Sequence, residues 1–289
     1  MFQKVKDKIQ VYGRMIKFSH TVFALPFALS ALVMAWESHP VSIRKLLWIL
    51  VAMVGARSAA MGFNRIVDAD IDLKNPRTAI REIPSGLLST KESMLFVLIS
   101  SAVFVLAAAM LSRLCLILAL PVLFFLFFYS YTKRFTKYCH LYLGCAIALS
   151  PIGTWIAITG TLGWGIFFLS LGLMTYIAGF DILYACQDIE FDKKEGLFSL
   201  PSKVGAKKAM KISSLLHFGT MVCFCLMHFS FNMHPVFLVF LAGIGIVLII
   251  EHTLVNPDDL THINMAFFHM NSMVSVTLFI GVLIQGVLK

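Results

Sequence analysis

Long apolar runs separated by short charged segments dominate the pattern of this chain. A transmembrane helix needs about 20 predominantly apolar residues to cross the hydrocarbon core of a bilayer. Nine runs approach this length, so the pattern predicts an all-α integral membrane protein with about nine transmembrane helices. The expected spans are residues 18–36, 46–66, 93–111, 114–131, 141–159, 164–185, 211–230, 235–252 and 266–287.

The composition supports this class. Of the 289 residues, 59% are hydrophobic and 13% are charged, whereas soluble domains average about 45–50% apolar and about 25% charged residues. An ordinary soluble protein is therefore excluded. Because no polar stretch is long enough for a separate soluble domain, one membrane domain over residues 1–289 is expected.

The net charge of +9 is explained by membrane topology better than by nucleic-acid binding. Lys and Arg gather in alternate loops, beginning with the basic N-terminal segment, and loops of this kind stay in the cytoplasm. The N-terminus is therefore predicted to be cytoplasmic, and no nucleic-acid partner is expected.

Seven of the fifteen acidic residues lie in two short segments, one closing span 46–66 and the other closing span 164–185. Positions four residues apart share one face of a helix. Asn64, Asp68 and Asp72 are therefore expected on one face of the first segment, and Tyr184, Asp188 and Asp192 on one face of the second. The remaining acids of the two segments are Asp70, Asp181 and Glu190.

Like charges one turn apart repel each other and destabilise a helix, so these carboxylates need cations between them. Magnesium suits this role because it prefers oxygen ligands and is often completed by substrate phosphates. A single Asp at a membrane surface is more simply a solvated charge. Two D-x-[DE]-x-D segments, both ending on the same side of the membrane, favour a metal site instead.

Basic residues follow each acidic segment. Carboxylates that hold metal ions beside Arg and Lys fit an oxygen-rich anion, and a diphosphate fits best. Arg57 lies inside the second expected span, where a charged side chain is costly and by default a functional candidate. The basic residues that follow are Lys74, Arg77 and Arg81 after the first segment, and Lys193, Lys194 and Lys203 after the second.

These motifs together resemble the UbiA family of membrane aromatic prenyltransferases. The first is N-x-x-x-D-x-x-x-D from Asn64 to Asp72, followed by the phrase NPRTxxRExPxG. The second is D-x-x-Y-x-x-x-D-x-x-x-D from Asp181 to Asp192. Between them, a Y-x-x-x-K-R segment runs from Tyr129 to Arg134. The resemblance covers nearly the whole chain.

The resemblance implies a polyprenyl diphosphate donor, an aromatic acid acceptor, Mg²⁺ as the cofactor, and membrane lipid around the protein. It also implies a helix bundle around a central cavity, which shields an allylic cation from water. One Mg²⁺ would be held by Asn64, Asp68 and Asp72, and another by Asp188 and Asp192. The diphosphate would be bound by Lys133, Arg77 and Arg14, with Arg134 in the same substrate-binding segment. Asp181 and Tyr184 would lie near the reacting carbon, with Asp181 as the base for the ring proton.

The acceptor stays open at this point. The NPRTxxRExPxG phrase resembles enzymes that prenylate 4-hydroxybenzoate in ubiquinone synthesis, and equally those that prenylate 1,4-dihydroxy-6-naphthoate on the futalosine route to menaquinone. Both acceptors carry a carboxylate, for which Arg57 or Arg81 would supply the cation. One position departs from the family, because its common Asn-Asp start reads Asn64-Arg65 here. The departure leaves the acceptor and the metal shell undecided in detail.

Two other classes of protein fit the acidic segments less well. A cation transporter would place its acids near the bilayer midplane on broken helices, whereas these acids cluster at one face of the membrane beside cations. A non-catalytic assembly protein has no need for clustered acids. His20, His140, His217 and His269 lack metal-ligand spacing and are expected to be interface or packing residues. The expected location is the bacterial inner membrane, with the active site facing the cytoplasm.

Overall fold

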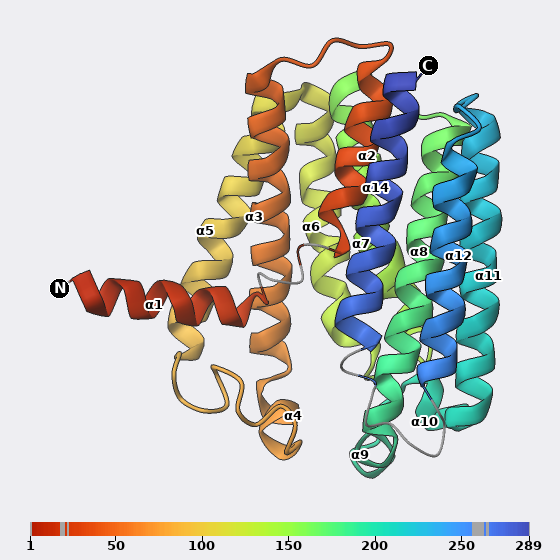
Figure 1. The fold of residues 1–289 in the computed structure, drawn as a ribbon. Coiled ribbons are helices and arrows are strands. Elements are labelled where there is room, and N and C mark those ends of the chain that lie inside the picture. The colour runs from red at the N-terminus through yellow and green to blue at the C-terminus, as the bar shows by residue number, and fades with distance from the viewer. Residues whose placement is uncertain (1, 18–20, 22, 256–262, 264–265, 289) are drawn as a thin grey trace. The chain divides into compact units, whose positions relative to one another are not determined.

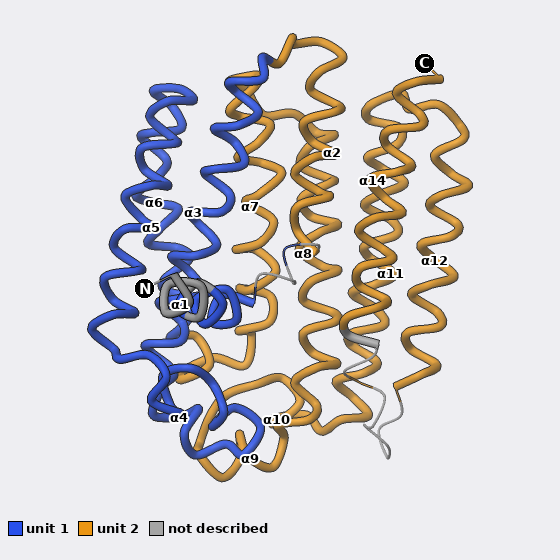
Figure 2. The backbone as a smooth tube through the Cα atoms, turned by 60° about the vertical axis from the view of Figure 1, so that its left-hand side comes forward, with its two compact units in different colours: residues 1–21, 42–131 blue, residues 22–41, 132–289 orange. Residues whose placement is uncertain are grey.

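A computed structural model describes residues 2–17, 21, 23–255, 263 and 266–288, and within these ranges the chain forms helices and no strands (Figure 1). The chain divides into two compact units (Figure 2). Unit 1 consists of residues 1–21 and 42–131, and unit 2 of residues 22–41 and 132–289. The predictions of a single domain, of a central cavity and of a cytoplasmic N-terminus stay predictions.

Eight helices in the described ranges are long and apolar enough to cross a membrane. They confirm the predicted class of integral membrane protein and the last eight predicted spans. The helices are α3 (Ile43–Val67), α5 (Thr90–Leu111), α6 (Arg113–Thr132), α7 (Cys139–Thr159), α8 (Trp164–Ala185), α11 (Ala206–Ser230), α12 (Phe237–Leu254) and α14 (Asn271–Leu288).

The first predicted span, 18–36, differs from the structure in length. Its helix, α2, covers only Leu25–Trp36 and has 12 residues. Pro26 lies in the first turn of α2, where proline is favoured because its missing N–H would have no partner within the helix. The hydrophobic pattern alone does not indicate this later helix start, which coincides with Pro26. Residues 18–20 and 22 of the predicted span lie outside the described residues.

Unit 1 contains α1 (Phe2–Met15), α3, α4 (Ala69–Lys74), α5 and most of α6. Helices α3 and α5 approach closely at Gly55, where a Cβ would lie 3.0 Å from the Phe104 nitrogen. Helix α6 joins α3 through the stacked rings of Phe63 and Phe127, whose centroids are 4.5 Å apart. Tyr12 of α1 stacks on Phe96 of α5. These contacts fix the end of α3 that carries the first acidic segment.

Unit 2 is organised around α8. This helix packs against α7 on one side and α11 on another, while α2 packs against α7 and α14, and α12 packs against α14. Two short helices, α9 (Ile189–Lys194) and α10 (Leu200–Val204), follow α8. Tyr176, Ile177 and Leu173 of α8 are fully buried. The second acidic segment therefore continues directly from the most buried helix of the unit.

A row of glycines lets α11 approach α8. Gly165, Gly172 and Gly179 recur every seven residues on α8, which keeps them near one face of the helix. A Cβ at these glycines would overlap, in turn, Phe231, Phe224 and His217, which recur every seven residues along α11. The two helices therefore run antiparallel in register, with small residues of one opposite large residues of the other, an arrangement favoured between membrane helices.

Candidate active site

The first acidic segment lies where α3 ends. Asp68 follows α3 with φ −91° and ψ 0°, and α4 begins at the next residue. The helical hydrogen-bond pattern nevertheless continues, because the Asp72 N–H donates to the Asp68 carbonyl at 2.8 Å. Asp68 and Asp72 are both 3% exposed, whereas Asp70 is exposed. The structure thus separates the two acids predicted to bind metal from the third.

Polar side chains surround these two carboxylates. The Asn64 amide donates to Asp68 Oδ2 at 3.0 Å and lies 3.5 Å from the Ser130 hydroxyl of α6. Arg81 Nη1 lies 2.7 Å from each oxygen of Asp72. The side chains of Asn64 and Asp68 therefore meet as the spacing predicts, while the Asp72 carboxylate pairs with Arg81. Arg81 is predicted to bind substrate, and in the structure it contacts Asp72, one of the predicted metal ligands.

Cations gather beside these acids around Lys17, which the sequence analysis did not select. Burial and, to a smaller extent, the nearby positive charges of four arginines together lower the pKa of Lys17 to about 8. A group of positive charges of this kind favours an anion, because each cation otherwise repels the others. Only the crowding of basic residues near the end of the N-terminal segment could have indicated Lys17 from the sequence. The four arginines are Arg65, Arg81, Arg77 and Arg57.

Arg57 and Arg65 both donate hydrogen bonds to backbone carbonyls near the end of α1. Arg57 Nη2 donates to the Lys17 carbonyl at 3.1 Å, and its buried Nε has no hydrogen-bond partner among the described residues. Arg65, the departure from the family motif, is 4% exposed and donates through Nε to the Met15 carbonyl at 3.2 Å. Arg65 therefore ties α3 to α1. Arg14, predicted to bind diphosphate, is exposed at the end of α1.

The second acidic segment occupies the turn after α8. Residues Cys186–Asp188 form a 3₁₀ turn, and α9 begins at Ile189. Asp188 is half-buried, and Asp192 is 9% exposed and accepts a hydrogen bond from the Ser199 hydroxyl at 2.5 Å. The tighter turn lies between Tyr184 and Asp188, whereas Asp188 and Asp192 stay one turn apart at the start of α9. Asp192 gains a partner from outside the motif.

Asp181 lies one turn before the end of α8 and contacts His140 of α7. His140 Nδ1 is 2.7 Å from Asp181 Oδ2, and the His140 side chain is almost fully buried. The expectation that His140 is an interface or packing residue leaves out this hydrogen bond to the predicted base. Tyr184 and the loop cations Lys133 and Arg134 of the same unit are half-buried.

The donor chemistry of these residues fits magnesium. Among the described residues, no three His, Cys, Asp or Glu side chains are grouped as a metal site. Mg²⁺ does not need such a cage, since it usually takes one or two carboxylates and completes its shell with waters and substrate phosphates. Asp68 with the Asn64 amide, and Asp188 with Asp192, supply oxygen donors of this kind, whereas zinc favours His and Cys ligands.

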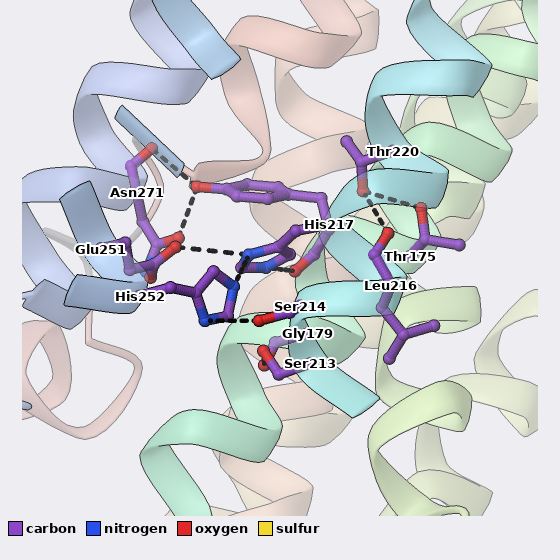
Figure 3. Close-up of polar contacts among 11 residues, drawn as sticks. Thr175, Gly179, Ser213, Ser214, Leu216, His217, Thr220, Glu251, His252 and Asn271 are labelled. Atoms are coloured by element: carbon purple, nitrogen blue, oxygen red, sulfur yellow. Dashed lines mark hydrogen bonds and ion pairs between the residues drawn. The ribbon is translucent and has the colours of Figure 1, made fainter. Parts of the chain in front are cut away.

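A second polar cluster lies inside unit 2, away from the acidic segments in sequence (Figure 3). It joins His217 of α11, Glu251 and His252 of α12, and Asn271 of α14. His217 and Glu251 are 2% and 1% exposed. Tyr176 of α8 donates its hydroxyl to Asn271. The expectation that His217 is a packing residue leaves out this network.

The hydrogen bonds of the cluster fix its protons. The Tyr176 carbonyl can only accept, so His217 donates to it through Nε2 at 3.3 Å. The Nδ1 atom of a neutral His217 is then an acceptor, and His252 Nε2 donates to it at 2.9 Å. His252 Nδ1 accepts in turn from the Ser214 hydroxyl at 3.2 Å. Both imidazoles are satisfied in their neutral forms.

Helix α3 and helix α8 are thus each followed by carboxylates and cations, side chains that can bind metal ions and anionic oxygen groups, in a helical membrane protein. The chain matches the UbiA prenyltransferase family over residues 24–273. This protein therefore belongs to the UbiA prenyltransferase family, and the predicted enzyme class, a prenyltransferase, is confirmed. Family membership sets aside the transporter and assembly-protein alternatives.

Two curated relatives match this chain at modest identity. A 4-hydroxybenzoate octaprenyltransferase from Dechloromonas aromatica (strain RCB) is 25% identical over 288 residues, which cover 97% of this chain and 95% of the relative. A 4-hydroxybenzoate octaprenyltransferase from Shewanella sp. (strain MR-4) is 29% identical over 224 residues, or 76% of this chain and 77% of the relative.

Solved structures share the fold. The apo structure of a UbiA homolog from Aeropyrum pernix K1 has a TM-score of 0.82 and 29% identity, and the match covers 92% of this chain and 97% of the homolog. A UbiA homolog from Archaeoglobus fulgidus, bound to DMAPP and Mg²⁺, has a TM-score of 0.70 and 18% identity, covering 94% and 99% of the two chains. The second likeness shows the fold alone.

Proposed function

We propose that this enzyme transfers a polyprenyl group from polyprenyl diphosphate to an aromatic acid, with 4-hydroxybenzoate as the first acceptor, in respiratory quinone synthesis. The observation that carries the proposal is the arginine and lysine cluster around Lys17, which lies beside the buried carboxylates Asp68 and Asp72 of unit 1. The names of the curated relatives, 4-hydroxybenzoate octaprenyltransferases, support the same acceptor.

The acidic segments would hold Mg²⁺ and the basic residues would bind the donor. Asn64, Asp68 and Asp72 would hold one ion, and Asp188 with Asp192 another. Bound Mg²⁺ supplies positive charge that stabilises the departing diphosphate. Arg77 and Lys133, with Arg14 and Arg134 as further candidates, would orient the diphosphate oxygens. Arg81 would exchange Asp72 for a phosphate oxygen, since a guanidinium binds either anion in the same forked geometry.

The reaction is an ionisation followed by a ring attack. The allylic C–O bond breaks and its electron pair leaves with the diphosphate. The aromatic ring then forms the new C–C bond to the allylic carbon, and the ring carbon loses its proton to a base. Asp181 is the base in this proposal, with Tyr184 near the reacting carbon. The apolar helices exclude water, which would otherwise capture the cation.

Arg57 would bind the acceptor carboxylate. It lies inside a membrane helix, its Nε has no partner among the described residues, and its Nη2 is already held by the Lys17 carbonyl. A guanidinium so held has N–H groups fixed in direction, and pairing with a carboxylate would satisfy the buried Nε. A phenolic acid would thus bind with its carboxylate at Arg57.

The excess of Lys and Arg in alternate loops supports an active site at the cytoplasmic face of the bacterial inner membrane.

A membrane assay with two competing acceptors tests the proposal. It uses a labelled polyprenyl diphosphate, Mg²⁺, 4-hydroxybenzoate and 1,4-dihydroxy-6-naphthoate. Prenylated 4-hydroxybenzoate is the expected product. Product from the naphthoate alone would assign the enzyme to the futalosine route to menaquinone instead. No product from either acceptor, with the protein folded, would contradict the proposed function.

A further inference from the structure

Four consecutive residues, from the turn after α9 to the first residue of α10, anchor different parts of unit 2, and we propose that they position the reactive side chains of the enzyme. The segment is Leu197–Leu200, here named the positioning strap. The inference rests on the proposed function, because it assigns a role to residues that act through Asp181 and Asp192. No residue of the strap itself is proposed to touch substrate.

The first half of the strap holds backbone. The Leu197 N–H donates to the Asp192 carbonyl at 2.8 Å, which closes the end of α9. The Phe198 N–H donates to the Lys133 carbonyl at 2.7 Å. The strap therefore joins the segment that carries a predicted diphosphate ligand to the segment that carries a predicted metal ligand.

The second half of the strap holds side chains. The Ser199 hydroxyl donates to Asp192 Oδ2 at 2.5 Å. The Leu200 N–H donates to His140 Nε2 at 3.3 Å. Through His140, the strap reaches Asp181, which lies 2.7 Å from the other ring nitrogen. One short segment thus contacts Asp192 directly and Asp181 through His140.

The bond from Leu200 determines what His140 does. A backbone N–H can only donate, so Nε2 of His140 is the acceptor and its proton is on Nδ1. The Nδ1–H then donates to Asp181 Oδ2. His140 therefore donates to Asp181 and keeps its carboxyl group in one orientation. Oδ1 is left as the oxygen that takes the ring proton.

The strap is itself held rigidly. Gly196 precedes it with φ +69°, a left-handed conformation that glycine adopts without strain and that turns the chain back after α9. Ser199 and Ser202 form a reciprocal capping box at the start of α10. Lys203 Nζ lies 4.1 Å from the centre of the Phe198 ring. A segment fixed at both ends can hold its partners to the geometry that catalysis needs.

The first experiment separates His140 from the base that it contacts. Steady-state kinetics are measured for His140→Leu, His140→Gln and Asp181→Asn in the full-length protein. His140→Leu should lower kcat roughly 10–100-fold, as loss of an orienting partner does, while KM for both substrates stays within about twofold. His140→Gln should recover most of kcat, because its amide can donate to Asp181 and accept from Leu200.

The outcomes distinguish the strap from the proposed function. Full turnover by Asp181→Asn would overturn Asp181 as the base, whereas a wild-type protein that makes no prenylated product would overturn the proposed function. An inactive Asp181→Asn beside a fully active His140→Leu would overturn the role of His140 alone. Equal losses in His140→Gln and His140→Leu would show that the ring acts through its shape and not through its hydrogen bonds.

The second experiment needs no turnover and applies even where His140 variants do not fold. Thermal unfolding of the detergent-solubilised chain is followed as Mg²⁺ is added with inorganic diphosphate. Ser199→Ala should need roughly 10–100-fold more Mg²⁺ for half of the stabilisation, and Ser199→Thr should resemble the wild type. Ser202→Ala is the matched control, because it loses the same capping box but does not contact Asp192. If Ser199→Ala and Ser202→Ala respond alike to Mg²⁺, the strap does not position Asp192.

Discussion

Arg81 Nη1 lies 2.7 Å from both carboxylate oxygens of Asp72, and Asp72 is almost fully buried. An Arg that compensates a buried carboxylate can be replaced by a metal ion, because either cation satisfies the same oxygens. The stability of unit 1 should therefore depend on whether a cation, either Arg81 or a metal ion, compensates the buried Asp72 carboxylate. This link leads to the first prediction.

Arg81→Gln should destabilise the metal-free protein by about 1–3 kcal/mol, because a buried carboxylate loses its partner. Added Mg²⁺ should restore part of the loss, since the ion compensates Asp72. The measurement is thermal unfolding in detergent with and without Mg²⁺. The double variant Asp72→Asn/Arg81→Gln is the control and should lose less than the sum of the single changes. Additive losses would contradict a direct interaction.

Asp68→Asn and Asp188→Asn should each lower Mg²⁺-dependent turnover roughly 100-fold or more, as loss of one charge-stabilising group does. The measurement is the initial rate of prenyl transfer across a Mg²⁺ titration. Asp70→Asn is a matched control, because Asp70 lies in the same segment but is exposed. Full activity in the first two variants would contradict the metal assignment.

Arg57→Leu should raise KM for the acceptor roughly 10–100-fold and leave KM for the diphosphate donor unchanged, because a hydrogen bond to a charged group contributes about 1.5–3 kcal/mol. Steady-state kinetics with each substrate varied in turn measures the effect. Arg44→Leu, at the opposite end of α3 and exposed, should leave both constants unchanged. An equal rise for donor and acceptor would place Arg57 at the diphosphate.

Gly172→Ala should destabilise unit 2 by about 1–3 kcal/mol, since overfilling a close-packed contact forces neighbouring atoms to shift. A Cβ at Gly172 would overlap Phe224, whose side chain is fully buried and cannot move aside. Thermal unfolding measures the change. Gly219→Ala on α11 is the control, because a Cβ there meets no atom within 4 Å. Equal behaviour of the two variants would contradict the close approach of α8 and α11.

Glu251→Gln should leave the thermal stability nearly unchanged. In the hydrogen-bond chain of Figure 3, His217 Nδ1 accepts from His252, and Glu251 Oε2 lies 3.5 Å from that same nitrogen. A carboxylate would face a lone pair there, so the neutral acid fits the site better. Infrared spectroscopy should show a carboxylic acid band that disappears in the variant. A loss of about 3–5 kcal/mol would instead indicate a buried ion pair with His217.

Local pattern determined the membrane class and much of the site. Apolar runs of about 20 residues predict transmembrane helices, because within a bilayer a single segment can satisfy its backbone N–H and C=O groups only by forming a helix. The i, i+4 spacing placed Asn64 and Asp68 together, and the cost of a charge in the membrane singled out Arg57. All of these inferences use residues within one helix or its end, where spacing determines direction.

Tertiary structure alone decided the partners. His140 and Asp181 are 41 residues apart and meet because α7 packs on α8. Ser199 reaches Asp192 because Gly196 turns the chain back after α9. His217 and Glu251 meet across α11 and α12. Helical periodicity tells which face a side chain occupies, but not which residue of another helix lies opposite it. That pairing depends on how the helices pack, and here glycines such as Gly144 and Gly179 set the approach.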